Sequence, residues 1–370
     1  MPQQPWRFET KGTEFVDFKT ITYLNEEGIL SPEYQGTITD ANLINGYKAM
    51  LITRLVDERM ITIQRQGIIS FAMSSLGEEA CAVASAAALE KEDWMYPQYR
   101  EAGIMFWRGF TIQKYIHNMF GDAQDLNLGR QMPNHFGARE LNVVTVSSPI
   151  GTKIPHAAGA AYAMKLQGEK SVAICYFGEG ATSEGDFHCG LNFAAVRKAP
   201  VIFFCRNNGY AISTPCERQF ASHGIAPKGV GYGMPAFRVD GNDFFAVHEI
   251  VSQARGYCLE GKGPVLIEAM TYRRGAHSTS DDPSLYRSEE EVKAWEMKCP
   301  LLRLRRYLTF KGLWDDTQEK ELTHQINEEI SEAINVSKNA SKPPLESLIE
   351  HVYFTVPQIL KEQLEHVRAD

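Results

Sequence analysis

The stretch Ala173–His188, AICYFGEGATSEGDFH, reads as an apolar strand, a glycine-rich turn and the polar start of a helix. A turn of this kind attracts phosphate, because its backbone N–H groups and the helix dipole favour a negative charge. Glu179, however, lies between Gly178 and Gly180, where its carboxylate would repel that phosphate. The turn alone therefore does not explain why a carboxylate lies between the two glycines.

The alternation of strand and helix continues along the chain. Apolar runs at 171–177, 201–205 and 264–270 predict buried strands, and helical spacing predicts helices at 184–196 and 245–260. Strands that alternate with helices in this way are typical of parallel sheets. We therefore expect an α/β fold, a parallel sheet with helices on both faces.

The flanking regions differ from this central section. Residues 1–41 are polar and punctuated by Pro and Gly, and we expect an extended N-terminal arm that lies on a partner surface. Residues 42–299 are expected to form the α/β domain, which begins with helices at 42–66 and 78–89. Residues 300–370 predict a helical C-terminal region that ends in an amphipathic tail.

The composition limits the partners. The chain has 370 residues, 44% hydrophobic and 23% charged, with a formal net charge of -8, as is typical of a soluble globular protein. The acidic balance and the absence of Lys/Arg runs argue against nucleic acid, and no apolar run is long enough to span a membrane. The seven cysteines form no C-x-x-C pair, so we expect reduced core thiols. Small molecules and other proteins remain as partners.

Three polar loops follow the predicted strands. They are GEGATSEG (178–185), RNNGYAIST (206–214) and TYRRGAHSTSDD (271–282). Ligands of open parallel sheets bind at the carboxyl ends of the strands, where adjacent strands bring such loops together. Glu179, Asn207, Asn208 and Tyr210 offer carboxylate, carboxamide and carbonyl oxygens, which suit a hard divalent cation that also binds phosphate. A magnesium ion between Glu179 and a diphosphate would turn the repulsion into two attractions.

Other interpretations of these residues are less demanding. A dinucleotide site expects an acid where this chain has Arg206, and a Walker P-loop needs a GK[ST] that is missing. The two glycines could serve only a tight turn, and Asn207 and Asn208 could be an ordinary turn pair. Tyr99 and Arg100 could form a surface cation–aromatic contact.

The motif GEG at 178–180, followed by Asn207 and Asn208, is similar to the GDG…NN motif of thiamin diphosphate enzymes. Five further stretches strengthen the likeness: QYREAG (98–103), RQMPNHFG (130–137), SSPIGT (147–152), FFCRNNGYAISTP (203–215) and EAMTYRRGAHSTSDDPSLYRS (268–288). Together they resemble the alpha subunit of branched-chain 2-oxo acid dehydrogenase, the decarboxylating component, over Phe15 to Tyr353. The resemblance implies a thiamin diphosphate-binding fold.

The resemblance also implies roles for individual residues. Magnesium would be bound by Glu179, Asn208 and the backbone carbonyl of Tyr210, and His277 would be the catalytic residue at the terminal phosphate. The family usually has Asp at the position of Glu179, whereas its branched-chain members resemble this chain in having Glu. The cofactor itself would be bound by Gln98, Tyr99, Arg100, Ser148, Ile150, Gly178, Gly180, Ala181, Arg206 and His277.

The implied activity is oxidative decarboxylation of branched-chain 2-oxo acids, derived from Val, Leu and Ile, with acyl transfer to a lipoyl group. The partners would be a beta subunit, in a heterotetramer of two alpha and two beta chains, and a lipoylated acyltransferase core. An alpha subunit of pyruvate or acetoin dehydrogenase and a non-catalytic assembly subunit are the alternatives. The location would be cytoplasmic in a bacterium, or the mitochondrial matrix in a eukaryote after processing.

One loop departs from the family pattern. Family members resemble SSPLATQIP and bind potassium there, whereas this chain has SSPIGTKIP, so Lys153 stands in place of a glutamine. A lysine offers no oxygen and its ammonium repels cations, which puts a potassium site at Ser147, Pro149 and Thr152 in doubt. Either Lys153 turns to solvent, or its ammonium takes the potassium position and donates to the oxygens of those three residues.

The resemblance finally points to two modifiable serines. Ser278 and Ser288 match phosphorylation positions of animal members of the family. A phosphate on Ser278 would add negative charge beside His277. Ser288 forms an S-x-x-E capping box with Glu291, so we expect Ser288 to be structural and Ser278 to be the sensitive position.

Overall fold

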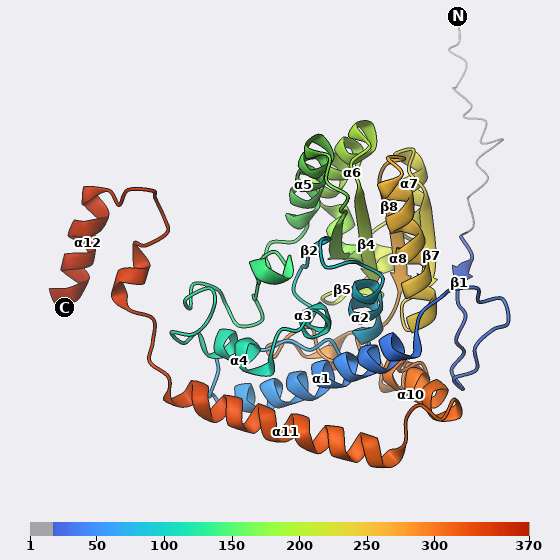
Figure 1. Ribbon diagram of the computed structural model, residues 1–370, viewed down its shortest axis with the longest axis horizontal. Helices are drawn as coiled ribbons and strands as arrows, with labels where there is room; N and C mark the ends of the chain where they lie inside the picture. The colour runs from blue at the N-terminus through green and yellow to red at the C-terminus, as the bar shows by residue number, and fades with distance from the viewer. Residues whose placement is uncertain (1–17, 370) are drawn as a thin grey trace, which may run out of the picture.

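The computed structural model describes residues 18–369, and a parallel six-stranded sheet lies at its centre in the order β1-β7-β8-β4-β3-β2 (Figure 1). The three predicted strands are confirmed as β3, β4 and β8. The strands are β1 (Thr20–Ile21), β2 (Trp94–Tyr96), β3 (Ala173–Gly178), β4 (Val201–Asn207), β7 (Ala236–Asp240) and β8 (Val265–Met270). The sequence analysis missed β1, β2 and β7, because two or three residues carry no period and β7 contains Arg238 and fully buries only Val239.

Helices cover both faces of the sheet, as predicted, and bury a separate core on each. Ile174 and Tyr176 of β3 point into one core, and Ala173, Cys175 and Phe177 point into the other. The first face carries α1 (Asp40–Arg65), α2 (Glu79–Ala87) and α8 (Phe244–Leu259), and the second carries α5 (Lys153–Gln167), α6 (Gly185–Arg197) and α7 (Ala226–Gly231). Burial on both faces explains why these strands read as unbroken apolar runs.

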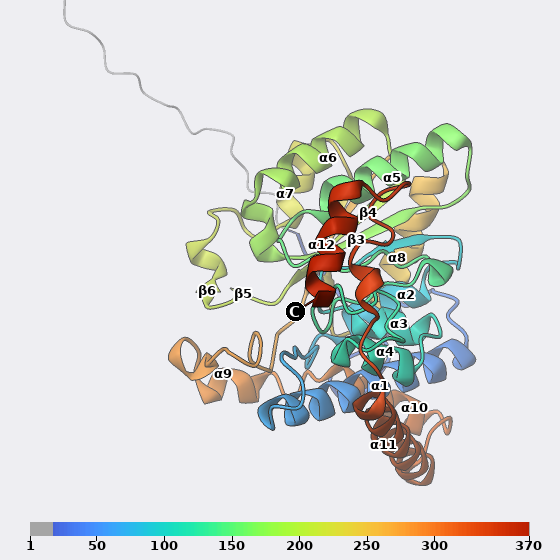
Figure 2. The same ribbon diagram turned by 90° about the vertical axis from the view of Figure 1, so that its left-hand side faces the viewer.

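A second layer of helices lies against α1. The predicted helical region after residue 299 forms α10 (Pro300–Phe310) and α11 (Asp316–Asn339), both of which pack against α1. Helix α11 runs along the outside of the molecule and also contacts α4 (Ile112–Phe120), as Figure 2 shows end-on. The remaining helices are α3 (Ala102–Trp107) and α9 (Glu289–Ala294). The boundaries at residues 41 and 299 stay a prediction.

The end of the predicted N-terminal arm lies on the chain's own body, so the expected partner surface is wrong for these residues. Strand β1 pairs with β7, and the carboxylate of Asp243 accepts hydrogen bonds from the backbone N–H groups of Tyr23 (2.5 Å) and Leu24 (2.7 Å). Asp243 also caps α8, which explains why it is buried. Residues 1–17 of the arm lie outside the described residues.

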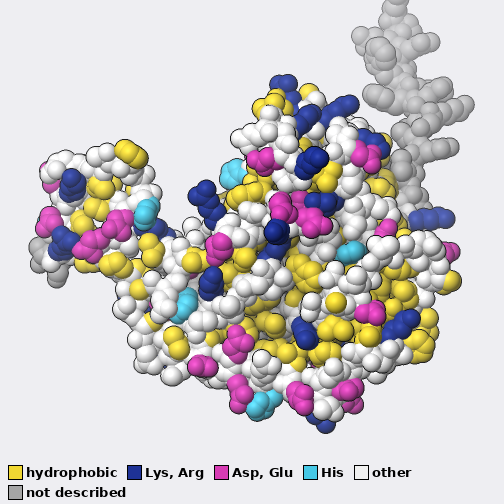
Figure 3. Space-filling model, viewed as in Figure 1, with side chains coloured by type: hydrophobic (Ala, Val, Ile, Leu, Met, Phe, Trp, Pro, Cys, Tyr) yellow, Lys and Arg dark blue, Asp and Glu magenta, His cyan; other side chains and the backbone are white. Residues whose placement is uncertain are grey.

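The C-terminal segment stands apart from the helices around the sheet. After α11 the chain runs through a short 3₁₀ helix, Leu345–Leu348, to α12 (Gln358–Ala369), which forms a separate lobe (Figure 1). Val352, Tyr353 and Phe354 are exposed there, and the lobe shows hydrophobic side chains between acidic and basic ones (Figure 3). The predicted amphipathic tail is therefore helical, but it has little of its own chain to cover it.

The cysteines and the helix lengths complete the fold. All seven cysteines are free, and five of them are buried. Cys189 is exposed and Cys216 is half-buried, so the prediction of core thiols is wrong for these two. Between residues 18 and 369 none of the helices has the length and apolarity needed to cross a membrane.

Candidate active site

The three predicted loops meet at the carboxyl edge of the sheet. Strand β3 pairs with β4 and β4 with β8, so that Gly178 lies opposite Arg206 and Asn207 lies opposite Met270. A 3₁₀ helix, Glu179–Ser183, follows β3 at once. The short hairpin β5 (Tyr210–Ala211) and β6 (Thr214–Pro215) follows β4. The expectation that adjacent parallel strands bring these loops together is confirmed.

These loops enclose a cavity of about 120 Å³. All the residues predicted to bind cofactor or magnesium line it except Ser148. The lining residues are Gln98, Tyr99, Arg100, Ile150, Gly178, Glu179, Gly180, Ala181, Arg206, Asn208, Tyr210 and His277, together with Ala211, Ile212 and Arg273. Sequence analysis missed the last three, although Arg273 stands only four residues before His277 in the third loop. Ser148 instead is hydrogen-bonded to His135, whose ring Nε2 contacts its hydroxyl.

Glu179 is a buried carboxylate without a cation. Its side chain is in a residue only 1% exposed, and its hydrogen bonds from Asn208 N (3.4 Å) and Gln219 Nε2 (3.5 Å) are long. Burial raises the pKa of Glu179 above its ordinary value, and within residues 18–369 no Lys, Arg or His forms an ion pair with it. A group in this state needs either a proton or a cation.

The amide of Asn208 is held beside that carboxylate. Its Nδ2 donates to Glu78 Oε1 (3.0 Å), and its Oδ1 accepts from Tyr210 N (3.2 Å). Since a carboxamide oxygen can accept twice, one lone pair of Oδ1 remains for another ligand. One carboxylate, one amide oxygen and one carbonyl suit a hard divalent cation that keeps other ligands from phosphate or water. Across the described residues no cluster of three His, Cys, Asp or Glu side chains forms a metal site.

The two glycines of the turn have different reasons to be there. A Cβ on Gly180 would lie 2.7 Å from the Cβ of Ala211, so glycine is required where the first and second loops touch. A Cβ on Gly178 would meet nothing closer than 4.0 Å, so packing does not require glycine there. Because Gly178 lines the cavity, the missing side chain leaves space there, while its backbone N–H donates to Gln98 Oε1 (3.0 Å).

Arg206 is held from below by two buried carboxylates that sequence analysis did not assign. Its Nη1 donates to Glu78 Oε2 (2.5 Å) and its Nε donates to Glu101 Oε1. Burial would lower the pKa of Arg206, but these two glutamates outweigh burial and raise it. Among the described residues, the third nitrogen, Nη2, makes no hydrogen bond, and it remains available to a ligand in the cavity.

His277 is uncharged at neutral pH. Burial lowers its pKa to about 4, and the guanidinium groups of Arg100 and Arg273 add to that shift. Both arginines face His277 Nδ1, at 3.2 and 3.4 Å, and since a guanidinium can only donate, Nδ1 is the acceptor. The ring proton is therefore on Nε2. Tyr99 packs edge-on against this ring at 6.0 Å, so the Tyr99–Arg100 contact is inside the site and not on the surface.

Comparison with known proteins agrees with this geometry. Residues 47–346 match the family model of the dehydrogenase E1 component.

The chain belongs to this family.

Curated relatives cover most of the E1 component chain. The mitochondrial 2-oxoisovalerate dehydrogenase subunit alpha of Dictyostelium discoideum is 47% identical over 354 residues, 94% of this chain and 80% of that protein. The subunit of the same name from Bos taurus is 46% identical over 338 residues, 91% of this chain and 74% of the relative. The mitochondrial 2-oxoisovalerate dehydrogenase subunit alpha 2 of Arabidopsis thaliana is 46% identical over 318 residues, 86% of this chain and 67% of that protein.

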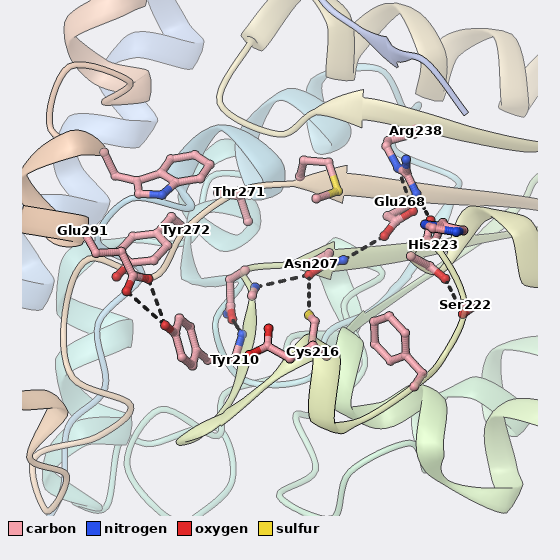
Figure 4. A pocket seen from close by; sticks show the side chains of 17 residues that line it. Asn207, Tyr210, Cys216, Ser222, His223, Arg238, Glu268, Thr271, Tyr272 and Glu291 are labelled. Carbon is pink, nitrogen blue, oxygen red and sulfur yellow. Dashed lines mark hydrogen bonds and ion pairs between the residues drawn. The ribbon is translucent and has the colours of Figure 1, made fainter. Parts of the chain in front are cut away.

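A larger cavity, of about 600 Å³, lies on the other side of the Asn207–Asn208 loop in this E1 component chain (Figure 4). The side chain of Asn207 points into it, donates to Glu268 Oε1 (2.7 Å) and accepts from Cys216 Sγ (3.3 Å). Asn208, the next residue, points to Glu78 on the cofactor side. The asparagine pair is thus no ordinary turn, because its two side chains organise two different cavities.

The predicted cation loop of the E1 component chain is formed by the residues before α5. The hydroxyl of Thr152 donates to Pro149 O (3.1 Å) and contacts the hydroxyl of Ser147 (3.2 Å). Lys153 does not turn to solvent, because it is only 8% exposed and burial lowers its pKa. Nor does its ammonium hydrogen-bond to Ser147, Pro149 or Thr152, so neither predicted conformation of Lys153 is right.

The two predicted phosphorylation positions, Ser278 in the third loop and Ser288 beyond it, occupy different environments. The hydroxyl of Ser278, next to His277, contacts that of Ser280 at 3.0 Å. Ser288 is the N-cap of α9 and accepts from Glu291 N (3.2 Å), so its predicted structural role is confirmed. The carboxylate of Glu291 does not complete the capping box, because it accepts from the hydroxyl of Tyr210 (3.0 Å). That bond joins α9 to the second loop.

Proposed function

We propose that this chain is the alpha half of a thiamin diphosphate-dependent enzyme that oxidatively decarboxylates branched-chain 2-oxo acids and transfers the acyl group to a lipoyl arm. The relatives named 2-oxoisovalerate dehydrogenase subunit alpha support the substrate class. The site supports the cofactor, and one observation carries most weight: among the described residues, Glu179 is buried without an ion pair to Lys, Arg or His, in the same cavity as Asn208 and Arg206.

The residues present fit a magnesium diphosphate group. Glu179, the Asn208 amide and the Tyr210 carbonyl would hold the metal, while Arg206 Nη2 would face the phosphates and the missing side chain of Gly178 would leave space for them. When bound, thiamin diphosphate would supply the electron sink for loss of carbon dioxide. This chain contributes position and charge. In particular, burial, together with the charges of Arg100 and Arg273, lowers the pKa of His277 to about 4, so that its Nε2–H is a hydrogen-bond donor at neutral pH.

The site is half of an active site. Its cavity of about 120 Å³ is small for a whole thiamin diphosphate and suits the diphosphate end. The rest would be completed by a beta subunit in a tetramer of two alpha and two beta chains, with a lipoylated acyltransferase as the acceptor. The exposed Tyr353 and Phe354 of the C-terminal segment support such a partner, because apolar surface of this kind marks an interface.

Two alternatives are less well supported. The relatives reported above carry the name 2-oxoisovalerate dehydrogenase, which weighs against a pyruvate or acetoin dehydrogenase. A non-catalytic assembly subunit would have no need for a buried, unpaired Glu179. The relatives' names also include the word mitochondrial, which supports the mitochondrial matrix if this chain is eukaryotic, whereas a bacterial chain would be cytoplasmic.

We further propose that the loop before α5 binds potassium. Ser147, Pro149 and Thr152 bring oxygens together, and Lys153 is buried next to them and makes no hydrogen bond to any of the three. If the loop still needs potassium, the assembled enzyme will melt at a lower temperature when potassium is replaced by tetramethylammonium, and Lys153→Gln will increase that difference. Equal melting temperatures in both salts would remove potassium from the proposal.

The proposed activity is tested by co-expressing this chain with its beta partner. Decarboxylation of 2-oxoisovalerate is measured against pyruvate, with and without thiamin diphosphate and magnesium. We expect activity that requires both additions and prefers the branched substrate. Activity on pyruvate alone would favour the alternative, and activity without the cofactor would overturn the proposal.

A further inference from the structure

We propose that Glu101 is a positioning residue that fixes two loops of the cofactor site in one register, an inference that rests on the proposed function. Glu101 does not line the cavity, and neither its sequence motif nor the resemblance assigned it a role. It is fully buried, at 0% exposure, directly behind the loop that carries Gln98, Tyr99 and Arg100.

One oxygen of Glu101 organises this loop. Its Oε2 accepts hydrogen bonds from three successive backbone N–H groups, those of Gln98 (2.9 Å), Tyr99 (3.1 Å) and Arg100 (3.1 Å). Three donors that converge on one anion fix the backbone of the loop. Since Glu101 precedes α3, its side chain turns back from the helix start to hold the residues before it.

The other oxygen reaches the end of a different strand. Oε1 accepts from Nε of Arg206 at the end of β4, and Glu78 accepts from Nη1 of the same guanidinium. A guanidinium held at two of its nitrogens cannot rotate, so the direction of the third is set. Glu101 thereby decides both where the loop at 98–100 lies and where Arg206 Nη2 points.

The charge of Glu101 shows that its role is orientation. A carboxylate close to a diphosphate site repels the ligand, so it lowers attraction for anions in general. Glu78 and Glu101 balance the charges of Arg100 and Arg206, all four of them in residues no more than 3% exposed. The site therefore gains a fixed geometry at the expense of unselective anion binding. Removal of the Glu101 charge should therefore weaken the binding of thiamin diphosphate, which needs the fixed geometry, more than the binding of a small anion.

The test compares two ligands on the co-purified alpha–beta complex. We expect Glu101→Gln to weaken thiamin diphosphate binding by about 10- to 100-fold, the usual effect of removing a supporting partner of a ligand group. A glutamine can accept on one side only, so it cannot serve both the loop and Arg206. Inorganic pyrophosphate with magnesium, titrated calorimetrically in the same way, should bind within about threefold of the wild type, because the lost negative charge offsets the lost geometry.

Asp93→Asn is the matched control. Asp93 is also 0% exposed and holds an arginine, Arg255 (2.6 Å), and two backbone N–H groups, Val172 (2.9 Å) and Glu90 (2.8 Å), but at the amino end of the sheet. Asp93→Asn should lower the melting temperature as much as Glu101→Gln while leaving both affinities unchanged. Glu101→Asp keeps the charge but not the reach, so it should fold and show a smaller loss of the same kind if Glu101→Gln does not assemble.

The outcomes separate this inference from the proposed function. A wild-type complex that binds no thiamin diphosphate would overturn the proposed function itself. A wild type that binds it, with Glu101 variants of unchanged affinity or with equal losses for both ligands, would overturn the positioning role alone.

Discussion

Glu179 and Glu268 are two buried glutamates on either side of the same loop, and they differ in almost every contact. Glu268, in β8, is 0% exposed and accepts from Asn207 Nδ2 (2.7 Å), Ala226 N (2.9 Å) and Arg238 Nε (3.1 Å). Glu179, 1% exposed, has two hydrogen bonds of 3.4 and 3.5 Å and no cation. A buried carboxylate that has close hydrogen bonds and an ion pair is part of the folded framework, whereas one that lacks them is a candidate to bind a ligand. We call Glu268 the satisfied glutamate and Glu179 the unsatisfied one.

The largest expected effect breaks the unsatisfied side of this comparison. Glu179→Ala and Asn208→Ala each remove a proposed metal ligand, so magnesium-dependent cofactor binding should weaken on the order of 100-fold or more. The melting temperature of the apoprotein should change little, because neither residue fills the core. Calorimetric titration of the assembled enzyme measures the affinity. Unchanged affinity in both variants would remove the metal assignment.

A new negative charge next to His277 should also have a large effect. Ser278→Glu adds a carboxylate next to His277, where it repels the diphosphate and disfavours the ordered loop. We expect loss of activity with the lipoyl acceptor. Ser284→Glu is the control, because it adds the same charge at an exposed position that is not adjacent to His277. Full activity of Ser278→Glu would refute the sensitivity of this position.

The satisfied side of the comparison predicts a loss of stability. Glu268→Gln breaks the ion pair with Arg238 and leaves a buried donor opposed to Asn207, so the free energy of unfolding should fall by about 1–3 kcal/mol. Cofactor affinity should stay within about twofold, since Glu268 faces the other cavity. Denaturant unfolding and the titration above give the two numbers. A variant with native stability and poor cofactor binding would reverse the assignment of the two glutamates.

The smallest expected effect is a gain in stability of the apoprotein, where the preceding prediction was a loss. Burial raises the pKa of Glu179 above 4.5, so the folded apoprotein holds this proton more tightly than the unfolded chain. Glu179 is therefore tolerated at low pH, and stability is lost as pH rises through the interval above 4.5, where the buried group ionises. Glu179→Gln should slightly raise the apoprotein melting temperature at pH 7, and the gain should vanish at pH 4.

Magnesium supplies the control for that effect. With cofactor and magnesium present, the wild type should recover the difference, because the metal compensates the ionised carboxylate. A Glu179→Gln apoprotein that is less stable than the wild type at pH 7 would show that this carboxylate is already satisfied.

The sequence predicts the parts of this site that follow from strand order. The runs that end at Gly178, Asn207 and Met270 are apolar because both faces of the sheet are buried, so their carboxyl ends, and the loops with Glu179 and Asn208, could be placed together. The supporting residues could not be placed. Glu78 and Glu101 begin helices far from the loops in the chain, and only the tertiary fold shows that they hold Arg206.

Short strands and side-chain directions were equally beyond the pattern. The two residues of β1 have no period, so the end of the arm was expected on a partner surface, although Asp243 binds it to α8. Lys153 was expected either at the surface or over the cation loop, because a lysine is seldom buried. Its side chain is buried at the start of α5 and interacts with Cys175 of β3, a neighbour that only the tertiary fold reveals.

The detached lobe around α12 has a consequence for how the protein is made. Because Tyr353 and Phe354 are exposed, a newly synthesised chain has an aggregation-prone C-terminal segment as soon as it leaves the ribosome. We expect the amount of soluble chain to depend on how much of the covering partner is made. Chains that bind this partner quickly stay soluble, and those made in excess precipitate or are degraded. The balance of synthesis between this chain and whatever covers the lobe, more than the strength of its core, sets how much of it accumulates.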